Sequence, residues 1–194
     1  LLSMLAEAYP DLEPRFVEEQ TQHLITRLRN GNLDLAIMAL PSEATGMVDS
    51  PLYTEKFSIV CPPDHPIAGR EDVELSELKD LDLLLLDDGH CLRDQVVDLC
   101  RHANINPAET TNSVTRASSL TTIMQLVMGG LGCTLVPESA LATECHGKDV
   151  AIAHFASDVT AEREVGLVFR SSAARSEEFR EFGTLITSAY NKAI

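Results

Sequence analysis

The sequence predicts an α/β fold, because helix and strand signals alternate along most of its 194 residues. The clearest strand is the apolar run DLDLLLLDD at 80–88, and a helical pattern follows it from about 91 to 102. A second helix begins at Ser118-Ser119 and is followed by the short strand CTLVP at 133–137. Repeated strand-helix units predict a mostly parallel sheet, or two such sheets, covered by helices. The helix after Ser119 has apolar residues at i, i+3, i+4, i+7 and i+8, namely Leu120, Ile123, Met124, Val127 and Met128.

The first third of the chain follows the same alternation. Residues 1–10 look like the end of an apolar helix, and 12–19 are expected to form a strand. A short helix over 21–31 should stop at Gly31, before an apolar strand over 34–40. The β-formers of 52–62 then predict a further extended segment.

The later elements are also predicted from residue pattern. Residues 62–74 are rich in turn formers and read as a surface loop, and a composition shift near 54–80 marks a possible domain crossing. Two more strands are expected over 112–118 and 163–170. An amphipathic helix over 176–190 should close the chain, with Phe179, Phe182, Ile186 and Ala189 on one face.

Composition and charge exclude several classes of protein. With 44% hydrophobic residues the chain can bury one large core or two modest ones. Its 15 basic and 30 acidic residues give a net charge of −15, which repels phosphate, so this segment should not itself bind DNA or an anionic membrane. No apolar run approaches the roughly 18 to 20 residues of a membrane span, and residues 1–13 lack signal-peptide features. We expect a cytoplasmic protein, and a longer native chain because the first residue is not Met.

The cysteines are few and odd in number. Five cysteines in a domain of this size favour a reducing compartment, where any disulfide is transient and functional. Cys61 and Cys133 lie in apolar runs and are expected to be small core hydrophobes, whereas Cys145 lies in a polar loop.

Other chemistry finds little support in the sequence. The Gly-rich stretch at 129–132 follows a helix and precedes a strand, which favours helix termination over a phosphate-binding loop. The pairs His90-Cys91 and Cys145-His146 lack the spacing of a metal site, and there is no G-x-S-x-G motif. The sequence also contains no C-x-x-C motif, which argues against a thiol peroxidase. We therefore expect no metal, no cofactor and no enzymatic activity.

The segment DDGHCLRDQVVDLC at 87–100 has a cysteine at each end of one expected helix. Over nine helical steps the two Cα atoms would be about 13.5 Å apart and on opposite faces, whereas a disulfide needs them within about 7 Å. One interpretation is that the two are unrelated, with Cys100 on the apolar face beside Leu92, Val96 and Leu99. The other is a redox pair, because a helix N-terminus and His90 favour a thiolate at Cys91, and its sulfenic acid would condense with Cys100 once the helix unwinds.

The same segment resembles the redox-active segment of peroxide-sensing LysR-type transcriptional regulators. The Gly-His-Cys-Leu-Arg-Asp-Gln core carries the resemblance, together with the second cysteine at this spacing. It extends over most of the chain, through YPDLE, QTQHLITRLRNGNLDLAIMAL, PLYTEKFSIVCPPDHPIA, RASSLTTIMQLVMGGLGCTLVP and VGLVFRSSAARSEEF. The resemblance implies a type 2 periplasmic-binding-protein-like α/β fold of two subdomains. The first would combine 1–54 with 162–194, and the second would hold 55–161.

The resemblance also implies roles for particular residues. Cys91 would be the peroxidatic cysteine and Cys100 the resolving one, joined in a disulfide when oxidised. Thr21, His90 and Arg163 would line the peroxide pocket. From the residues alone, Thr21 could equally be only a helix N-cap and Arg163 only a surface residue.

The implied function is the redox-sensing domain of a regulator of the oxidative-stress response. Its partners would be hydrogen peroxide, further copies of itself in a dimer within a tetramer, and DNA through a winged helix-turn-helix that is absent from this chain. The family's first β-strand, with a second pocket threonine, is also expected to be missing here. The alternative is a LysR-type effector domain that binds a small organic ligand in the cleft between its subdomains.

Overall fold

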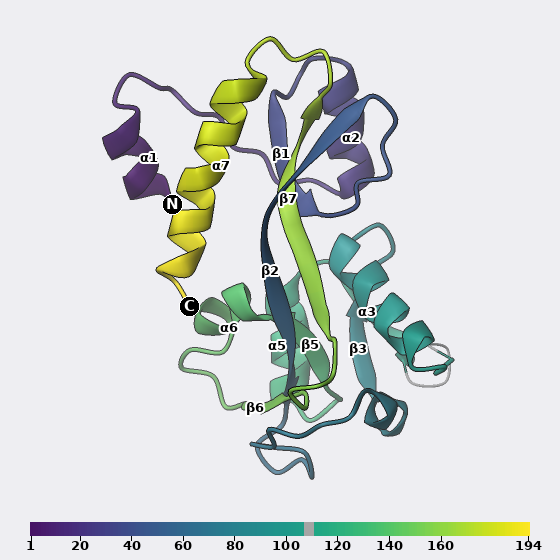
Figure 1. Ribbon diagram of the computed structural model, residues 1–194. Coiled ribbons are helices and arrows are strands. Elements are labelled where there is room, and N and C mark those ends of the chain that lie inside the picture. Colours follow the sequence, from purple (N-terminus) through teal and green to yellow (C-terminus); the bar gives the residue numbers. More distant parts are fainter. Residues whose placement is uncertain (107–110) are drawn as a thin grey trace. The chain divides into compact units, whose positions relative to one another are not determined.

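The computed structural model describes residues 1–106 and 111–194, and its side chains outside 111–116 (Figure 1). It divides into two compact units. Unit 1 consists of Leu1–Thr54 and Arg163–Ile194, and unit 2 of Glu55–Glu162. The chain enters unit 2 within the long strand β2 (Met47–Cys61) and returns to unit 1 at the start of β7 (Glu162–Arg170). This second crossing lies one residue later than the boundary we expected.

Unit 1 packs helices on strand β1 and its partner β7. β1 pairs antiparallel with β7, with Leu35 opposite Phe169 and Ala39 opposite Val165. One core cluster contains Ile25, Leu28, Ala36, Met38 and Val168, and another contains Leu167, Phe169, Phe179 and Ile186. The elements of unit 1 besides β2 and β7 are α1 (Leu2–Ala8), α2 (Thr21–Arg29), β1 (Leu35–Ala39) and α7 (Ser176–Asn191).

The strand expected over 12–19 is wrong. Residues 9–20 contain no helix or strand, and every side chain from Pro10 to Glu19 is exposed. A strand needs a neighbour for its backbone groups and a buried face for its side chains, and this segment has neither. Pro14 also lacks the N–H that a central ladder position would donate.

Unit 2 contains the second half of β2 and most of the shorter elements. Two hydrophobic clusters form its core, one on each face of the β2 strand, around Ile59 and around Val60. The elements are η1 (Leu75–Asp80), β3 (Leu83–Leu86), α3 (Cys91–His102), β4 (Thr111–Ala117), α5 (Leu120–Met128), β5 (Thr134–Pro137), α6 (Glu138–Glu144) and β6 (Ala151–His154).

The strand directions of the described pairs differ from those we expected. β3 pairs in parallel with β4, but β2 pairs antiparallel with both β5 and β6, and β1 pairs antiparallel with β7. The prediction of mostly parallel sheets is therefore wrong. A parallel pair follows from a strand-helix-strand unit, whereas β2 enters unit 2 directly from unit 1 with no helix before it.

The glycine-rich stretch at 129–132 terminates a helix, as the sequence predicts. α5 is capped at its start by the Ser119 side chain, which accepts a hydrogen bond from the Thr122 N–H at 3.2 Å, and it ends with Gly129 as C-cap. Gly130 has a φ of +75° and Gly132 one of +151°. These backbone angles turn the chain from α5 into β5, so the glycines serve the fold.

Gly132 is a position where we expect a strong effect on stability. A Cβ atom placed there would lie 2.3 Å from the Asp82 carbonyl oxygen, which is backbone and cannot move aside without disturbing β3. Gly132→Ala should therefore lower the free energy of unfolding by about 2 kcal/mol or more, since overpacking typically costs about 1 to 3 kcal/mol. Urea denaturation would measure it, with Gly147→Ala as control because a Cβ there meets nothing within 4 Å. Equal losses in the two variants would contradict the close approach at Gly132.

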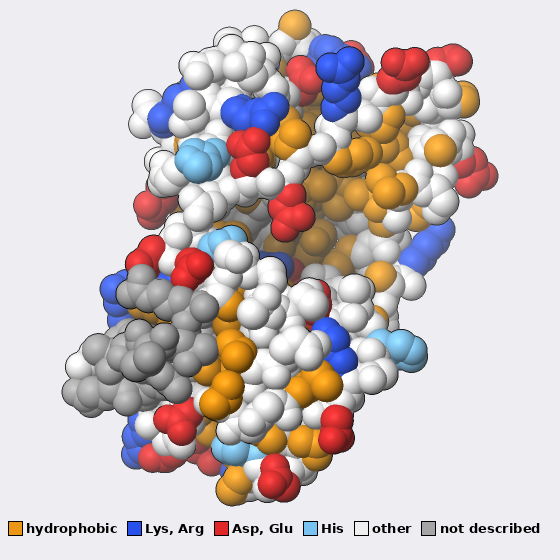
Figure 2. All heavy atoms as spheres, turned by 180° about the vertical axis from the view of Figure 1, so that it is seen from behind, with side chains coloured by type: hydrophobic (Ala, Val, Ile, Leu, Met, Phe, Trp, Pro, Cys, Tyr) orange, Lys and Arg blue, Asp and Glu red, His pale blue; other side chains and the backbone are white. Residues whose placement is uncertain are grey.

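The surface in Figure 2 carries acidic and basic side chains in small groups, with no large basic patch on that face. In the described part of the chain, no helix is both long and apolar enough to cross a membrane.

Candidate functional site

The site is built on the turn that joins β3 to α3. The Asp87 N–H donates to the Ala117 carbonyl oxygen at 2.9 Å and so anchors the end of β3 beside β4. Gly89 has a φ of +91°, a conformation that other residues adopt only with strain. His90 is the N-cap of α3, with φ −87° and ψ 122°. The junction predicted from DDGHCLRDQVVDLC is thus confirmed.

Cys91 is the first residue of α3 and is partly exposed. N–H groups in the first turn of a helix have no partner within the helix, and their dipoles favour a negative charge. The His90 carbonyl accepts the N–H groups of Arg93 at 3.0 Å and Asp94 at 3.4 Å, which fixes the start of the helix. An oxidant in solution therefore has access to the Cys91 sulfur at the start of α3.

Arg93 links the turn to the helix by ion pairs, a role that the sequence pattern did not predict. Its guanidinium lies 2.9 Å from an Asp88 carboxylate oxygen and 3.6 Å from an Asp94 carboxylate oxygen. Both aspartates are about two-thirds exposed, so each ion pair is worth at most about 1 kcal/mol. The sequence sign of these ion pairs is an arginine with one aspartate five residues before it and another directly after it.

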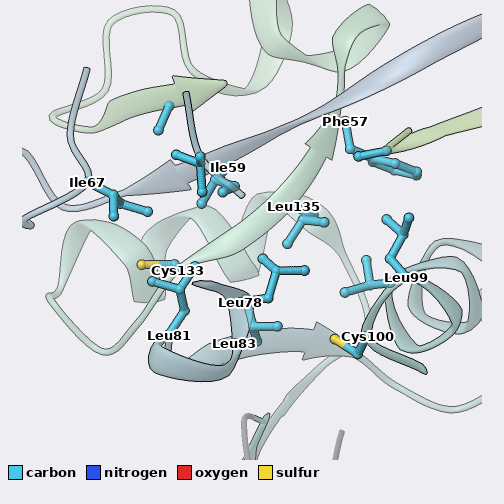
Figure 3. Packing of buried hydrophobic residues seen from close by; sticks show 14 of the residues in the cluster. Phe57, Ile59, Ile67, Leu78, Leu81, Leu83, Leu99, Cys100, Cys133 and Leu135 are labelled. Carbon is cyan, nitrogen blue, oxygen red and sulfur yellow. The ribbon is translucent and has the colours of Figure 1, made fainter. Parts of the chain in front are cut away.

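Cys100 lies at the opposite end of α3 in a different environment. Its exposed fraction is 0%, and it belongs to the larger core cluster of unit 2 (Figure 3). Figure 3 shows its sulfur near Leu83 of β3, next to Leu99 on the same helix. A buried thiol of this kind does not meet an oxidant while α3 is folded.

The two cysteines of α3 cannot form a disulfide in this conformation. None of the five cysteines, all of which lie within the described residues, is in a disulfide. Because α3 is continuous from Cys91 to His102, nine helical steps separate the two Cα atoms by about 13.5 Å and place them on opposite faces. A bond between them therefore needs at least part of α3 to unwind.

The remaining cysteines are less reactive. Burial raises the pKa of Cys61, and it raises that of Cys133 to about 12, with further contributions from the nearby Cys61 and Asp82. Burial also raises the pKa of Cys145, although the charge of Lys148 partly opposes it. Their burial confirms the prediction that Cys61 and Cys133 are core hydrophobes.

These environments predict an order of alkylation in the folded protein. With iodoacetamide at pH 8, Cys91 should react first, because it is partly exposed at a helix N-terminus. Cys133 should stay unlabelled, since a pKa of about 12 leaves about one molecule in ten thousand as thiolate at this pH. Peptide mass spectrometry after short labelling gives the order, and earlier labelling of Cys133 than of Cys91 would contradict these environments.

The other predicted pocket residues lie in unit 1. Thr21 is the first residue of α2, and Gln20 is its N-cap, so the alternative that Thr21 is only an N-cap is wrong. Arg163 is half-buried in β7. Cys91, Cys100 and His90 belong to unit 2. Joint action of Thr21 and Arg163 with Cys91 stays a prediction.

Among the described residues, no group of three or more His, Cys, Asp or Glu is arranged to hold a metal ion.

Comparison with known proteins identifies the family. The model of the LysR substrate binding domain matches residues 1–191. The chain belongs to this family. It therefore has the periplasmic-binding-protein-like α/β fold that the sequence predicts.

The most informative relatives are peroxide regulators. The structure resembles the H2O2-bound C206S mutant of Corynebacterium glutamicum OxyR, with 60% identity and a TM-score of 0.96 over 99% of this chain and 60% of that chain. It also resembles the reduced form of OxyR, with 32% identity and a TM-score of 0.83 over 96% and 85% of the two chains. A probable hydrogen peroxide-inducible genes activator of Mycobacterium avium is 47% identical over 96% of this chain. This chain spans 58% of the length of that relative.

Proposed function

We propose that this chain is the peroxide-sensing regulatory domain of a transcriptional regulator of the oxidative-stress response. The observation that carries the proposal is the placement of Cys91, partly exposed at the start of α3, with Cys100 fully buried at the other end of the same helix. The similarity to peroxide-inducible activators and OxyR regulatory domains supports it.

The proposed chemistry consumes one peroxide and releases two waters. The Cys91 thiolate attacks one oxygen of H2O2, the O–O bond breaks, and the departing hydroxide takes a proton to become water. This leaves a sulfenic acid on Cys91. After α3 unwinds, the Cys100 sulfur attacks the Cys91 sulfur, and the second hydroxide leaves as water. The product is a Cys91–Cys100 disulfide, and the two thiols have each lost one electron.

We assign supporting roles to three further residues. The Thr21 hydroxyl would orient peroxide and pass a proton. His90 and Arg163 would favour the thiolate and the departing hydroxide, because both can donate hydrogen bonds to a negative charge. His90 is adjacent to Cys91 as the N-cap of α3, which supports its part.

Membership of the family supports a wider proposal for the whole protein. We propose that the domain works in the cytoplasm as a dimer within a tetramer, and that DNA is bound by a winged helix-turn-helix in front of this chain. The disulfide would change how copies of the domain pack and thereby how the DNA-binding domains engage a promoter. Because each chain would be oxidised once rather than turned over, the domain would act as a sensor and not as an enzyme.

A peroxide titration tests this proposal. The reduced chain is treated with one equivalent of H2O2, denatured in iodoacetamide and digested without reductant. We expect a linked peptide pair containing Cys91 and Cys100, while Cys61, Cys133 and Cys145 remain alkylated. Full alkylation of Cys91 and Cys100 after this treatment would rule the proposal out.

A second candidate function, the binding of a small organic ligand, is favoured by one observation. Unit 2 contains a cavity of about 320 Å³ with charged groups of both signs and two aromatic rings in its wall. A thermal shift with a metabolite and none with peroxide would favour this function over redox sensing. The Ser58 Oγ lies 3.0 Å from the His154 Nδ1. The polar residues that line the cavity are Lys56, Ser58, Glu71, Glu138, His154 and Ser157.

A further inference from the structure

Two of the core cysteines lie opposite each other on neighbouring strands. β2 pairs antiparallel with β5, and in this register Val60 lies opposite Thr134 and Ile59 opposite Leu135. One position further along, the same register places Cys61, the last residue of β2, opposite Cys133, directly before β5. Side chains that are opposite in an antiparallel pair project from the same face of the sheet.

The backbone hydrogen bonds of Cys133 show which kind of pair this is. Its N–H donates to the Asp82 carbonyl at 2.9 Å, and its carbonyl accepts the Leu84 N–H at 2.8 Å. Both groups are therefore directed toward β3, on the side of β5 away from β2. Continued by one position, the register would make Cys61 and Cys133 a non-hydrogen-bonded pair, a geometry in which Cα atoms are typically about 4.5 Å apart. This separation lies within the range that disulfides span, roughly 4.4 to 6.8 Å.

Two further observations place the thiols together. Cys61 and Cys133 belong to the same hydrophobic cluster, and the exposed fraction of each is 0%. The charge on Cys61 also contributes to the raised pKa of Cys133, which requires proximity. Figure 3 shows Cys133 inside this cluster, beside Leu81. The Cys61 thiol also donates weakly to the Ala151 carbonyl oxygen at 3.7 Å.

We propose that Cys61 and Cys133 are a second oxidisable pair, which forms a cross-strand disulfide under excess peroxide or a thiol oxidant of the diazene class. With peroxide, one thiolate attacks an oxygen, a water leaves, and the sulfenic acid condenses with the other thiol to release a second water. With a diazene, the two electrons and two protons of the thiols reduce its N=N bond to a hydrazine. Unlike the cysteines of α3, this pair needs no helix to unwind.

The pair should react slowly and only after the exposed thiol. Both side chains are buried, and thiols with raised pKa are mostly protonated at neutral pH. Once formed, the bond would join β2 to β5 and close a loop through most of unit 2. A covalent link of this kind restricts the unfolded chain and so stabilises the fold. We infer that strong oxidation makes unit 2 more rigid, which is a different outcome from the local unwinding at α3.

The test removes the other cysteines that can react. A variant of the 194-residue chain with Cys91→Ser, Cys100→Ser and Cys145→Ser is treated with excess diamide, denatured in iodoacetamide and mapped without reductant. We expect a linked peptide pair containing Cys61 and Cys133, lighter than the two separate peptides by two hydrogens. The midpoint of thermal unfolding should rise by several degrees and return to its original value with dithiothreitol. Adding Cys61→Ala should remove both effects.

Two results would overturn the proposal. If Cys61 and Cys133 are both fully alkylated after oxidation and denaturation, the pair does not form a disulfide. If the triple variant does not fold, the same mapping is done on the unsubstituted chain, in which peptides of Cys61 and Cys133 are resolved separately from those of the α3 cysteines. Cross-links from Cys61 to any cysteine other than Cys133 would also contradict the register argument.

Discussion

Cys91→Ser should abolish the peroxide-dependent cross-link completely. A serine hydroxyl has nearly the size of the thiol but is not a nucleophile toward peroxide at neutral pH, so no sulfenic acid forms at the start of α3. Cys100 is fully buried and cannot replace it while the helix is folded. We expect no consumption of the first equivalent of peroxide by the variant, measured by loss of H2O2 and by peptide mapping.

Cys145→Ser is the matched control for this prediction. Cys145 is also partly exposed, but burial raises its pKa and it lies outside α3. The control should consume peroxide and form the Cys91–Cys100 bond like the parent chain. Undiminished peroxide consumption by Cys91→Ser would exclude Cys91 as the reacting thiol.

The stability of α3 should control how fast the disulfide forms. Asp98 is in the middle of α3, its side chain is 58% exposed, and its described ion pair is with Arg101 at 2.8 Å. Asp98→Ala and Asp98→Gly both remove this pair, so they differ only at the backbone. Glycine costs about 1 kcal/mol relative to alanine inside a helix, which makes unwinding about fivefold more favourable. The glycine variant should therefore form the disulfide about fivefold faster than the alanine variant.

The measurement separates the two chemical steps. A sulfenic-acid probe follows the first step at Cys91, which should run at nearly equal rates in the two variants. The second step is followed by quenching samples at intervals and mapping the linked peptides. The fivefold difference in rate should appear in this step. Equal rates of disulfide formation in the glycine and alanine variants would mean that unwinding of α3 does not precede the bond.

Local signals in the sequence predicted the elements that have strong periodicity or clear ends. The buried LLLL run, the glycine before Cys91 and the apolar face of α3 located the β3-α3 junction correctly. The segment 12–19 has β-forming residues but no partner strand, and single-sequence patterns do not report partners. Strand direction failed for the same reason, because β2 and its neighbours are brought together by long-range contacts.

Some features of the candidate site could be predicted from the sequence, and others could not. The positions of Cys91 and Cys100 on one helix follow from spacing, since nine helical steps have a fixed length and rotation. The ion pairs of Arg93 depend on the shape of the turn, which the sequence does not specify. The Cys61 and Cys133 pairing depends on strand register, and the 71 residues between the two in the chain give no sign of it.

Oxidation of Cys91 to the disulfide should be accompanied by loss of helical structure in α3. Hydrogen exchange of the amides over residues 90–101, measured on reduced chain and on chain oxidised to the Cys91–Cys100 disulfide, tests it most directly. In the reduced chain the amides of residues 93–101 should be protected by the helix, and in the oxidised chain most of them should exchange at nearly unprotected rates, while those in the later turns of α5 stay protected. A chain that contains the disulfide and keeps its protection over α3 would contradict the account.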